Sequence, residues 1–377
     1  MNTRKKNPKI VISGYYGFDN CGDEAVLLSI VHCLKKLLPD VRITVLSGNP
    51  EKTRELYGVK AVNRWNPITI KLELLTSHLL ISGGGSLLQD VTSARSPLYY
   101  LGVILFARLL RKKVMIYSQG VGPLNLEENR ARVKKVLDRC HALTVRDSRS
   151  AELLRELGVR RDIQITCDPV MALNRDDIHD TAFESGTAMD LLQEFGISDS
   201  AKSQRKPLLL VFVRCWKDDR HISPVAELLD SQIKKGWDVL LAPAHFPDDN
   251  EANAKLAAEM SARPFIVDKC LTAREFLALT AQADRVFSMR LHGLISAMAV
   301  GTQMAGISYD PKVDAFMEQA GLEEYCLPFD DFSLETAAQL MERLDSPPSS
   351  NIHVNEERRL EMQKLAWKAA EKAIELL

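Results

Sequence analysis

Short apolar runs rich in β-branched residues alternate along the chain with amphipathic stretches of helical period. This alternation is typical of βαβ units, in which helices join parallel strands. Helices are predicted to begin near Asp23, Glu51, Leu98, Glu127 and Arg149. The strands predicted in this first half read KIVISGY, RITVLS, HLLISGGG, KVMIYSQGVG, ALTVRDS and IQITCDPV.

The strand pattern lapses between Asp176 and Pro207, where the chain is polar and charged, and restarts with LLLVFVRC. DVLLAPA, FIVD, RVFSMRLH and TQMAGIS follow, so a second parallel sheet is expected. The predicted fold class is α/β, with two Rossmann-like domains that face each other across a cleft holding the chemistry. The expected parts are an N-terminal Rossmann-like domain over 1–175 on the acceptor side, a linker over 176–206, a C-terminal Rossmann-like domain over 207–350, and a bracing helix over 351–377.

The amino-acid composition excludes some classes of function for this protein. Apolar residues make up 46% of the 377 residues and charged residues 26%, a balance that supports two buried cores. Lys and Arg total 49 against 50 Asp and Glu, so the basic excess expected of a nucleic-acid-binding protein is missing. The seven cysteines are scattered without metal-ligand spacing, which predicts reduced thiols in a cytoplasm and no metal site.

Two segments bear on export and membranes. The N-terminal apolar run breaks at Gly14 and is followed by no cleavage motif, so no export signal is predicted. The stretch from Leu98 to Leu110, about 20 Å long as a helix, is too short to span a bilayer. It ends in a basic run at 111–113, and we expect peripheral contact with the inner membrane face.

Ligands of open parallel sheets bind outside the carboxyl ends of the strands, and five strand endings carry suggestive residues. The first is a glycine-punctuated loop, 13–24, which contains Asn20, Asp23 and Glu24. It is either a βα turn with an Asp cap or a site that holds sugar hydroxyls. Its carboxylates would repel phosphate, which favours the sugar interpretation over a phosphate loop.

The second and third endings are rich in glycine. Gly83, Gly84 and Gly85 allow close approach of a ligand to the backbone, and we expect their N–H groups to lie at a helix start. Gln119 opens the third ending, QGVGP, which is predicted to be a tight turn.

The last two endings carry cations. Arg146 closes one strand and either faces a ligand or pairs with a neighbouring Asp as a structural clamp. Arg290 and His292 join a strand end to a helix start, where the helix dipole tends to keep an imidazole neutral. With Lys312 further along, they make a convergent cationic site plausible.

These endings, in this order and spacing, resemble the polysaccharide pyruvyl transferase family, in particular its bacterial members that act on the secondary cell-wall polymer anchoring surface-layer proteins. The motifs that carry the resemblance are NCGDE at 20–24, SGGG at 82–85, QGVGP at 119–123, VRDS at 145–148 and RLHG at 290–293.

The resemblance implies a fold similar to that of GT-B glycosyltransferases, with phosphoenolpyruvate as donor and a lipid-linked saccharide as acceptor. The implied product is a 4,6-linked pyruvate ketal on N-acetylmannosamine, formed with release of phosphate. His292, Arg146 and Lys312 fall on the positions expected to be catalytic. Substrate-binding residues are expected among the other motif positions: Asn20, Asp23, Glu24, Gly83, Gly84, Gly85, Gln119 and Arg290.

The residues suit that reaction on chemical grounds. Phosphoenolpyruvate carries a carboxylate and a phosphate, which Arg146, Arg290 and Lys312 are suited to bind. His292, titrating near neutrality, suits the proton transfers, and no cofactor or metal is needed. Two alternatives stay open: a nucleotide-sugar-dependent glycosyltransferase or epimerase of the same fold, and a non-catalytic saccharide-binding protein.

Overall fold

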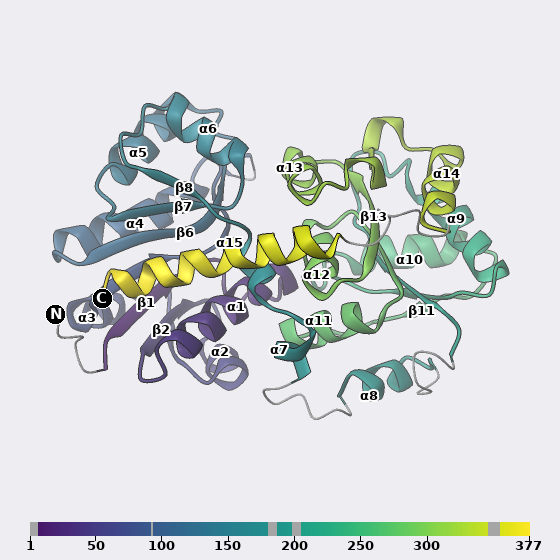
Figure 1. The fold of residues 1–377 in the computed structure, drawn as a ribbon, viewed down its shortest axis with the longest axis horizontal. Helices are drawn as coiled ribbons and strands as arrows, with labels where there is room; N and C mark the ends of the chain where they lie inside the picture. Colours follow the sequence, from purple (N-terminus) through teal and green to yellow (C-terminus); the bar gives the residue numbers. More distant parts are fainter. Residues whose placement is uncertain (1–6, 92, 180–186, 198–204, 346–354) are drawn as a thin grey trace. The chain divides into compact units, whose positions relative to one another are not determined.

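A computed structural model describes residues 7–91, 93–179, 187–197, 205–345 and 355–377. The chain divides into two compact units, each an α/β structure with its own sheet (Figure 1). Unit 1 comprises Met1–Phe18, Asp23–Ala172 and Met362–Leu377. Unit 2 comprises Asp19–Gly22 and Leu173–Glu361.

Every strand pair of unit 1 is parallel, and the sheet order is β3-β2-β1-β4-β6-β7-β8, with β5 paired to β6. The central strands are buried on both faces, which explains their continuous apolar sequences. The order reverses between β1 and β4, where ligands of such sheets bind. The strands are β1 (Lys9–Ser13), β2 (Arg42–Ser47), β3 (Lys60–Asn63), β4 (Leu79–Ser82), β5 (Gly85–Leu88), β6 (Lys113–Val121), β7 (Ala142–Val145) and β8 (Ile163–Ile165).

Helices cover both faces of this sheet. Side chains from α3, α4, α5 and α6 share one hydrophobic core with the strands. Right-handed crossovers place α1 and α2 on the opposite face, where Trp367 of α15 donates a hydrogen bond to Ala172 O and packs on His32 of α1. The helices are α1 (Cys21–Leu37), α2 (Pro50–Tyr57), α3 (Pro67–Thr76), α4 (Ser96–Leu109), α5 (Glu127–Leu137), α6 (Ser148–Glu156) and α15 (Glu356–Glu375).

The sheet of unit 2 is also parallel, in the order β11-β10-β9-β12-β13-β14. Its order reverses between β9 and β12. The strands are β9 (Leu208–Phe212), β10 (Asp238–Leu241), β11 (Phe265–Ile266), β12 (Arg285–Ser288), β13 (Gln303–Ser308) and β14 (Cys326–Pro328). The helices are α7 (Arg175–His179), α8 (Thr187–Glu194), α9 (Ile222–Lys234), α10 (Asn250–Glu259), α11 (Ala273–Gln282), α12 (Leu291–Val300), α13 (Pro311–Ala320) and α14 (Leu334–Asp345).

Two local predictions were wrong. The glycines at 83–85 do not open a helix: Gly83 N–H is hydrogen-bonded to Ser13 O, and Gly85 begins the short strand β5. The segment at 119–121 is not a turn, because β6 continues to Val121. Both errors have one cause: β5 pairs with the end of β6 and holds glycine-rich chain extended.

The units differ from the expected domains in three places. Asp19–Gly22, from the first loop, clusters with unit 2, and the unit boundary after the first sheet falls at Ala172. The final helix is shared, since residues up to Glu361 belong to unit 2 and the rest to unit 1. The expected linker contains α7 and α8, while its residues 180–186 and 198–204, like 351–354 of the expected final segment, lie outside the described residues.

Glu73 ties α3 to β1, β2 and β3 of unit 1. Its carboxylate lies 2.7 Å from Lys9 Nζ and 2.6 Å from Lys60 Nζ, and accepts a hydrogen bond of 3.2 Å from the Thr44 hydroxyl. Burial by itself raises the pKa of Glu73, but the hydrogen bonds from Lys60 and Lys9 outweigh it and hold the pKa below its usual value. The ionised form therefore stabilises the fold.

We expect Glu73→Gln to lower the free energy of unfolding at pH 7 by about 1–3 kcal/mol, because two lysines lose their carboxylate. The folded pKa is depressed, so the stabilisation is present above the unfolded pKa of about 4.3 and disappears as the pH falls through the folded value. Urea unfolding of wild type and variant between pH 7 and pH 3 measures this convergence. Glu55→Gln, at an exposed site on α2, is the control, and a pH-independent difference would contradict the argument.

Candidate functional site

The carboxyl edge of the unit 1 sheet contains buried polar atoms. The Gln119 amide donates to Ser82 Oγ at 2.8 Å and to Gly83 O at 2.7 Å. Gln119 Oε1 and the Tyr16 hydroxyl are buried without a hydrogen-bond partner among the described residues. Buried polar atoms normally have partners, so both are candidates to bind a ligand or an ordered water.

Tyr16 stays a neutral hydroxyl. Burial raises its pKa well above the usual value, and the carboxylates of Asp23 and Glu24 add to the effect. The hydroxyl lies over Gly83, where a Cβ would come within 2.2 Å of it. Tyr16 is therefore a hydrogen-bonding group, not a base, at any pH near neutrality.

The remaining residues of the NCGDE and SGGG motifs differ in the groups that they contact. Asp23 lies over Gly85, whose φ of +89° and lack of a Cβ make room for the carboxylate; a Cβ would lie 2.7 Å from Asp23 Oδ1. A Cβ on Gly84 would collide with Pro169 at 2.8 Å. Glu24 accepts hydrogen bonds from Gly17 N–H at 2.6 Å and from the Tyr57 hydroxyl at 2.5 Å, so its carboxylate holds the loop.

Arg146 follows β7 and is buried between two carboxylates. Its guanidinium lies 3.3 Å from Asp147 and 3.5 Å from Asp168, and donates to Ser86 Oγ at 3.0 Å. It covers Gly120, where a Cβ would come within 2.6 Å of Nη2. The clamp alternative for Arg146 is thus realised, while direct contact with a substrate stays a prediction.

In unit 2 the segment Asp19–Gly22 is bound to the loop after β10. Asn20 forms a bridge with His245, and Cys21 N–H donates to Ala244 O at 2.8 Å. Gly22 packs on the half-buried His292, where a Cβ would lie 2.2 Å from Nδ1. The structure thus brings Gly22, from the first motif, against His292, from the last, while Asn20 pairs with His245.

Asp249 organises the same loop and was not found in the sequence. It is fully buried and accepts hydrogen bonds from Ala244 N–H at 3.0 Å and His245 N–H at 2.9 Å. Arg290 Nε donates to its Oδ2 at 3.0 Å, and Arg290 Nη2 contacts Oδ1. Burial would lower the pKa of Arg290, but Asp249 outweighs it and raises the pKa. Arg290 is therefore committed to Asp249, two residues before His292.

A second cation missed in the sequence lies at the reversal point of this sheet. Arg214 follows β9, and its guanidinium lies 5.2 Å from the ring centroids of both Trp216 and Tyr309. It donates to the Tyr309 hydroxyl at 3.3 Å and, among the described residues, forms no ion pair with a carboxylate. Two aromatic rings thus hold a charged guanidinium in place with its charge uncompensated.

Lys312 is the second residue of α13. Asp310 caps this helix, accepting from Lys312 N–H at 3.1 Å, and its other oxygen lies 3.1 Å from Lys312 Nζ. Tyr309, whose ring contacts Arg214, and Lys312 both lie in the segment that follows β13. The carboxyl edge of the unit 2 sheet therefore presents Arg214, His292 and Lys312.

A cavity of about 770 Å³ opens on unit 1 beside the ends of β2 and β3. Its lining includes several asparagine amides, the aromatic ring of Phe18 and the charged side chains of Glu51 and Arg54. Such a mixture suits a saccharide, because hydroxyl groups bond to amides and a sugar face packs on a ring. The polar residues in the lining include Asn49, Asn63, Asn66 and Thr69.

A profile of the family described as polysaccharide pyruvyl transferase matches residues 20–311. The chain belongs to the polysaccharide pyruvyl transferase family. The match begins at Asn20 and spans all five motifs that carry the resemblance, and Lys312 follows its last residue. A search of curated proteins found no match.

Solved structures of other activities share this pyruvyl transferase's GT-B-like fold. UDP-GlcNAc 2-epimerase from Methanocaldococcus jannaschii is 13% identical with a TM-score of 0.65, covering 97% of this chain and 99% of that one. The Neisseria meningitidis epimerase bound to UDP-GlcNAc is 12% identical with a TM-score of 0.60, covering 98% and 99%. A glycosyltransferase from Rickettsia africae is 12% identical with a TM-score of 0.57, covering 99% and 96%. At these identities the likeness shows the fold alone.

We expect Asp249→Asn to lower the free energy of unfolding of this pyruvyl transferase by about 3 kcal/mol or more, because Arg290 would be left buried without its counter-charge. Urea unfolding followed by circular dichroism measures the change. Asp248→Asn, which alters the adjacent and exposed carboxylate, is the matched control and should cost below about 1 kcal/mol. Equal losses in the two variants would contradict the assignment.

Proposed function

We propose that this protein transfers the pyruvyl group of phosphoenolpyruvate to a lipid-linked cell-wall saccharide and forms a 4,6-linked pyruvate ketal on N-acetylmannosamine. The observation that supports this most is the cationic carboxyl edge of unit 2, where Arg214 and Lys312 accompany His292. The acceptor belongs to the secondary cell-wall polymer that anchors surface-layer proteins. The enzyme works in the cytoplasm, where such acceptors are assembled on lipid.

The donor has two anionic groups, and unit 2 offers two cations suited to them. Arg214 presents a planar fork of N–H donors that matches a carboxylate or phosphate bidentately, and its aromatic neighbours keep it oriented. Lys312 lies at the start of α13, where the helix dipole adds to its charge. In the proposal the phosphate draws the Lys312 ammonium away from Asp310.

The first chemical step adds one acceptor hydroxyl to C2 of phosphoenolpyruvate. The methylene C3 receives a proton, C2 becomes oxocarbenium-like, and the hydroxyl oxygen bonds to C2 as it loses its own proton. His292 in its protonated form delivers the proton to C3 and recovers one from the hydroxyl. The product of this step is a tetrahedral ketal phosphate.

The second step breaks the bond between C2 and the phosphate oxygen. Inorganic phosphate departs with the electron pair, stabilised by the cations, and the second hydroxyl attacks C2 to close the ring. The proton of this hydroxyl passes through His292 to the departing phosphate. The two hydroxyl protons thus end on C3 and on phosphate, and no cofactor or metal enters the balance.

The acceptor saccharide is assigned to unit 1. Gln119 Oε1 and the Tyr16 hydroxyl have free hydrogen-bonding capacity for sugar hydroxyls, and the cavity lined by Asn63 and Asn66 accommodates further residues of the saccharide. Asp23, held over Gly85, is the carboxylate assigned to orient the reacting diol. Arg146 fixes this edge by holding Asp147 and Asp168.

A nucleotide-sugar transferase or epimerase is the rival, since the solved structures with this fold include enzymes of UDP-sugars. Such a site is expected to place an acidic residue on the ribose hydroxyls after the helix that starts at 291. The segment 298–308 contains none, and Asp310 caps α13 and pairs with Lys312. These observations favour phosphoenolpyruvate over a nucleoside.

We expect His292→Gln to reduce the rate of acceptor-dependent phosphate release from phosphoenolpyruvate by about 10²–10⁴-fold, because the group that transfers both protons is removed. The assay uses purified protein with a lipid-mimetic N-acetylmannosaminyl disaccharide. His141→Gln changes an exposed histidine just before β7, at the amino edge of the unit 1 sheet, and is the control for loss of an imidazole.

A wild-type protein that leaves phosphoenolpyruvate intact but turns over a UDP-sugar overturns the proposed function in favour of the rival. Turnover of neither substrate, with measurable saccharide binding, favours the non-catalytic alternative. A His292→Gln rate within a few-fold of wild type rejects the role of His292 alone.

Arg214→Gln is expected to raise the KM for phosphoenolpyruvate by about tenfold or more, since a charge-assisted contact to the donor is worth about 1.5–3 kcal/mol. The KM for the acceptor should change little, because unit 1 is assigned to bind it. The matched control is Arg220→Gln, at an exposed arginine paired with Asp330. A rise in the acceptor KM without a rise in the donor KM would contradict the assignment.

A further inference from the structure

Helix α3 is apolar on two faces. Its inner face buries Ile70 and Leu74 against the unit 1 core. Its outer face exposes Ile68, Leu72 and Leu75, a spacing of four and three residues that forms one stripe along the helix. Ile68 is 70% exposed. A stripe of this kind differs from the single exposed leucines that are normal on protein surfaces.

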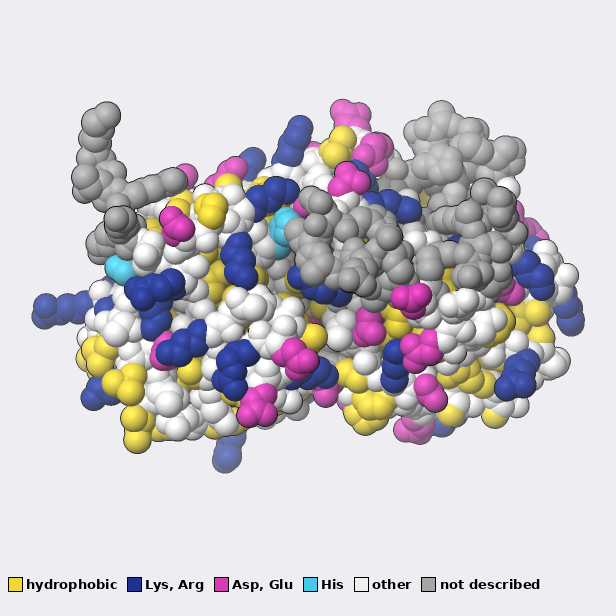
Figure 2. All heavy atoms as spheres, turned by 90° about the horizontal axis from the view of Figure 1, so that it is seen from below, with side chains coloured by type: hydrophobic (Ala, Val, Ile, Leu, Met, Phe, Trp, Pro, Cys, Tyr) yellow, Lys and Arg dark blue, Asp and Glu magenta, His cyan; other side chains and the backbone are white. Residues whose placement is uncertain are grey.

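Helix α4 extends the stripe. Leu98, Leu105 and Leu109 are exposed at spacings of seven and four residues, which lie on one side of a helix. Leu109 is 78% exposed. Figure 2 shows hydrophobic side chains gathered at the left end of the molecule, the end at which Figure 1 labels α3.

The two helices lie side by side. At their start, the rings of Trp65 and Tyr99 are 5.1 Å apart, and the Tyr99 hydroxyl donates to Arg64 O. At their end, Lys112 Nζ donates to Leu75 O at 2.8 Å. The exposed stripes therefore form one surface, which we call the α3–α4 face: Trp65, Ile68, Leu72, Leu75, Leu98, Leu105 and Leu109.

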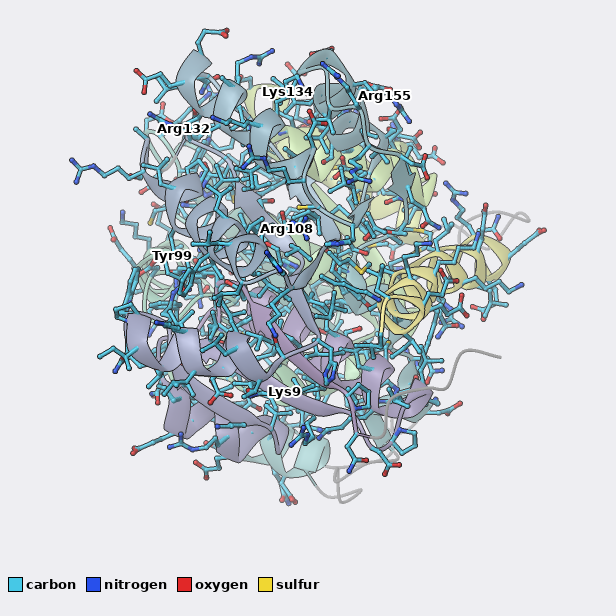
Figure 3. The ribbon with its side chains drawn as sticks, turned by 90° about the vertical axis from the view of Figure 1, so that its left-hand side faces the viewer. Lys9, Tyr99, Arg108, Arg132, Lys134 and Arg155 are labelled. Carbon is cyan, nitrogen blue, oxygen red and sulfur yellow. The ribbon has the colours of Figure 1, made fainter. Side chains whose placement is uncertain are left out.

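The charges around the α3–α4 face are of one sign. The only acidic residue in segments 64–78 and 95–113 is Glu73, which is buried and forms ion pairs with Lys9 and Lys60. The exposed charged residues of these segments are basic: Lys71, Arg95, Arg111 and Lys113. Figure 3, viewed from this end, labels one further cation of α4, Arg108, whose guanidinium donates to Lys112 O.

We propose that the α3–α4 face docks unit 1 onto the surface of an anionic lipid bilayer, with the apolar stripes inserted among the acyl chains and the flanking cations against lipid phosphates. Leucine stripes, an exposed Trp at the border and basic flanks are the combination that binds membrane interfaces. No described helix is both long and apolar enough to cross a bilayer, so this is attachment to one leaflet.

The position of the cavity on unit 1 indicates a role for attachment to the membrane. Its lining includes Asn66 and Thr69, at the start of α3, and a smaller hollow beside it is lined by Trp65 and Pro67. A saccharide carried on a membrane lipid would therefore emerge next to the cavity assigned to bind it. This purpose rests on the proposed function, whereas the docking itself does not.

The docking is tested by sedimentation with phosphatidylglycerol-containing vesicles, in the absence of phosphoenolpyruvate and acceptor. Wild type should bind these vesicles and bind phosphatidylcholine vesicles much more weakly. Ile68→Ser with Leu72→Ser should weaken binding by about tenfold or more, since burial of a leucine side chain is worth about 1.5–3 kcal/mol. Leu126→Ser with Ile165→Ser, at exposed sites elsewhere on unit 1, is the matched control and should leave binding unchanged.

The electrostatic part has its own pair of variants. Lys71→Gln with Lys113→Gln should weaken binding by about 30-fold at low salt, since each cation near an anionic leaflet contributes about 1 kcal/mol. Lys364→Gln with Lys368→Gln removes two exposed charges from α15 and should have little effect. The difference between the two pairs should shrink as salt is raised.

Two results would overturn the proposal. One is vesicle binding that is absent in wild type or equal in the stripe and control variants. The other is a wild-type dimer, seen by light scattering, that the stripe variant converts to a monomer without vesicle binding in either. Phosphate release with a water-soluble acceptor should be the same in wild type and stripe variant, so failure of docking is distinguishable from failure of the proposed chemistry.

Discussion

The functional edge of unit 2 depends on one buried carboxylate. Asp249 binds two backbone N–H groups of its own loop and the guanidinium of Arg290, 41 residues away in the chain. A charge this deeply buried is tolerable only because every oxygen has a partner. The loop whose N–H groups bind Asp249 also pairs with Asn20 through His245. Arg290 directly precedes the helix that carries His292. One ion pair thus fixes the backbone on both sides of the imidazole.

The geometry of parallel sheets explains which residues of this site can be predicted from the sequence. A residue directly after a buried strand must emerge at the carboxyl edge, so Arg146 and His292 could be located from strand patterns alone. The same rule applied to LLLVFVRC would have found Arg214, which ends a strand at the reversal point of its sheet. Asp249 was beyond reach, because its burial is decided by a partner on another strand and its own segment reads as a polar loop.

The sequence predicts helices and strands whose apolar residues recur with a clear period. It misses a strand that forms only because a neighbouring strand pairs with it. Strand β5 has too few residues and too many glycines to show alternation, and it exists because β6 offers it a free edge. Helix α3 was missed for the opposite reason: apolar residues on two faces erase the helical period that a one-sided helix displays. The segment 67–76, which lacks a clear helical period, is therefore the helix that has apolar side chains on both its buried and its exposed face.

The α3–α4 face and the polar groups at the carboxyl edges of the two sheets serve different requirements of the proposed reaction. Binding the proposed dianionic donor requires fixed cations with little competing charge, and unit 2 offers Arg214, which packs against two aromatic rings and pairs with no carboxylate of the described residues. Binding the proposed saccharide requires hydrogen-bond donors and acceptors, and unit 1 offers amides and a tyrosine whose pKa burial raises. The proposed lipid-linked acceptor adds a third demand, because such a molecule diffuses only in the plane of the membrane. Exposure of an apolar stripe to water is unfavourable and is relieved when lipid covers it, so the position of the stripe beside the amide-lined cavity suits that encounter.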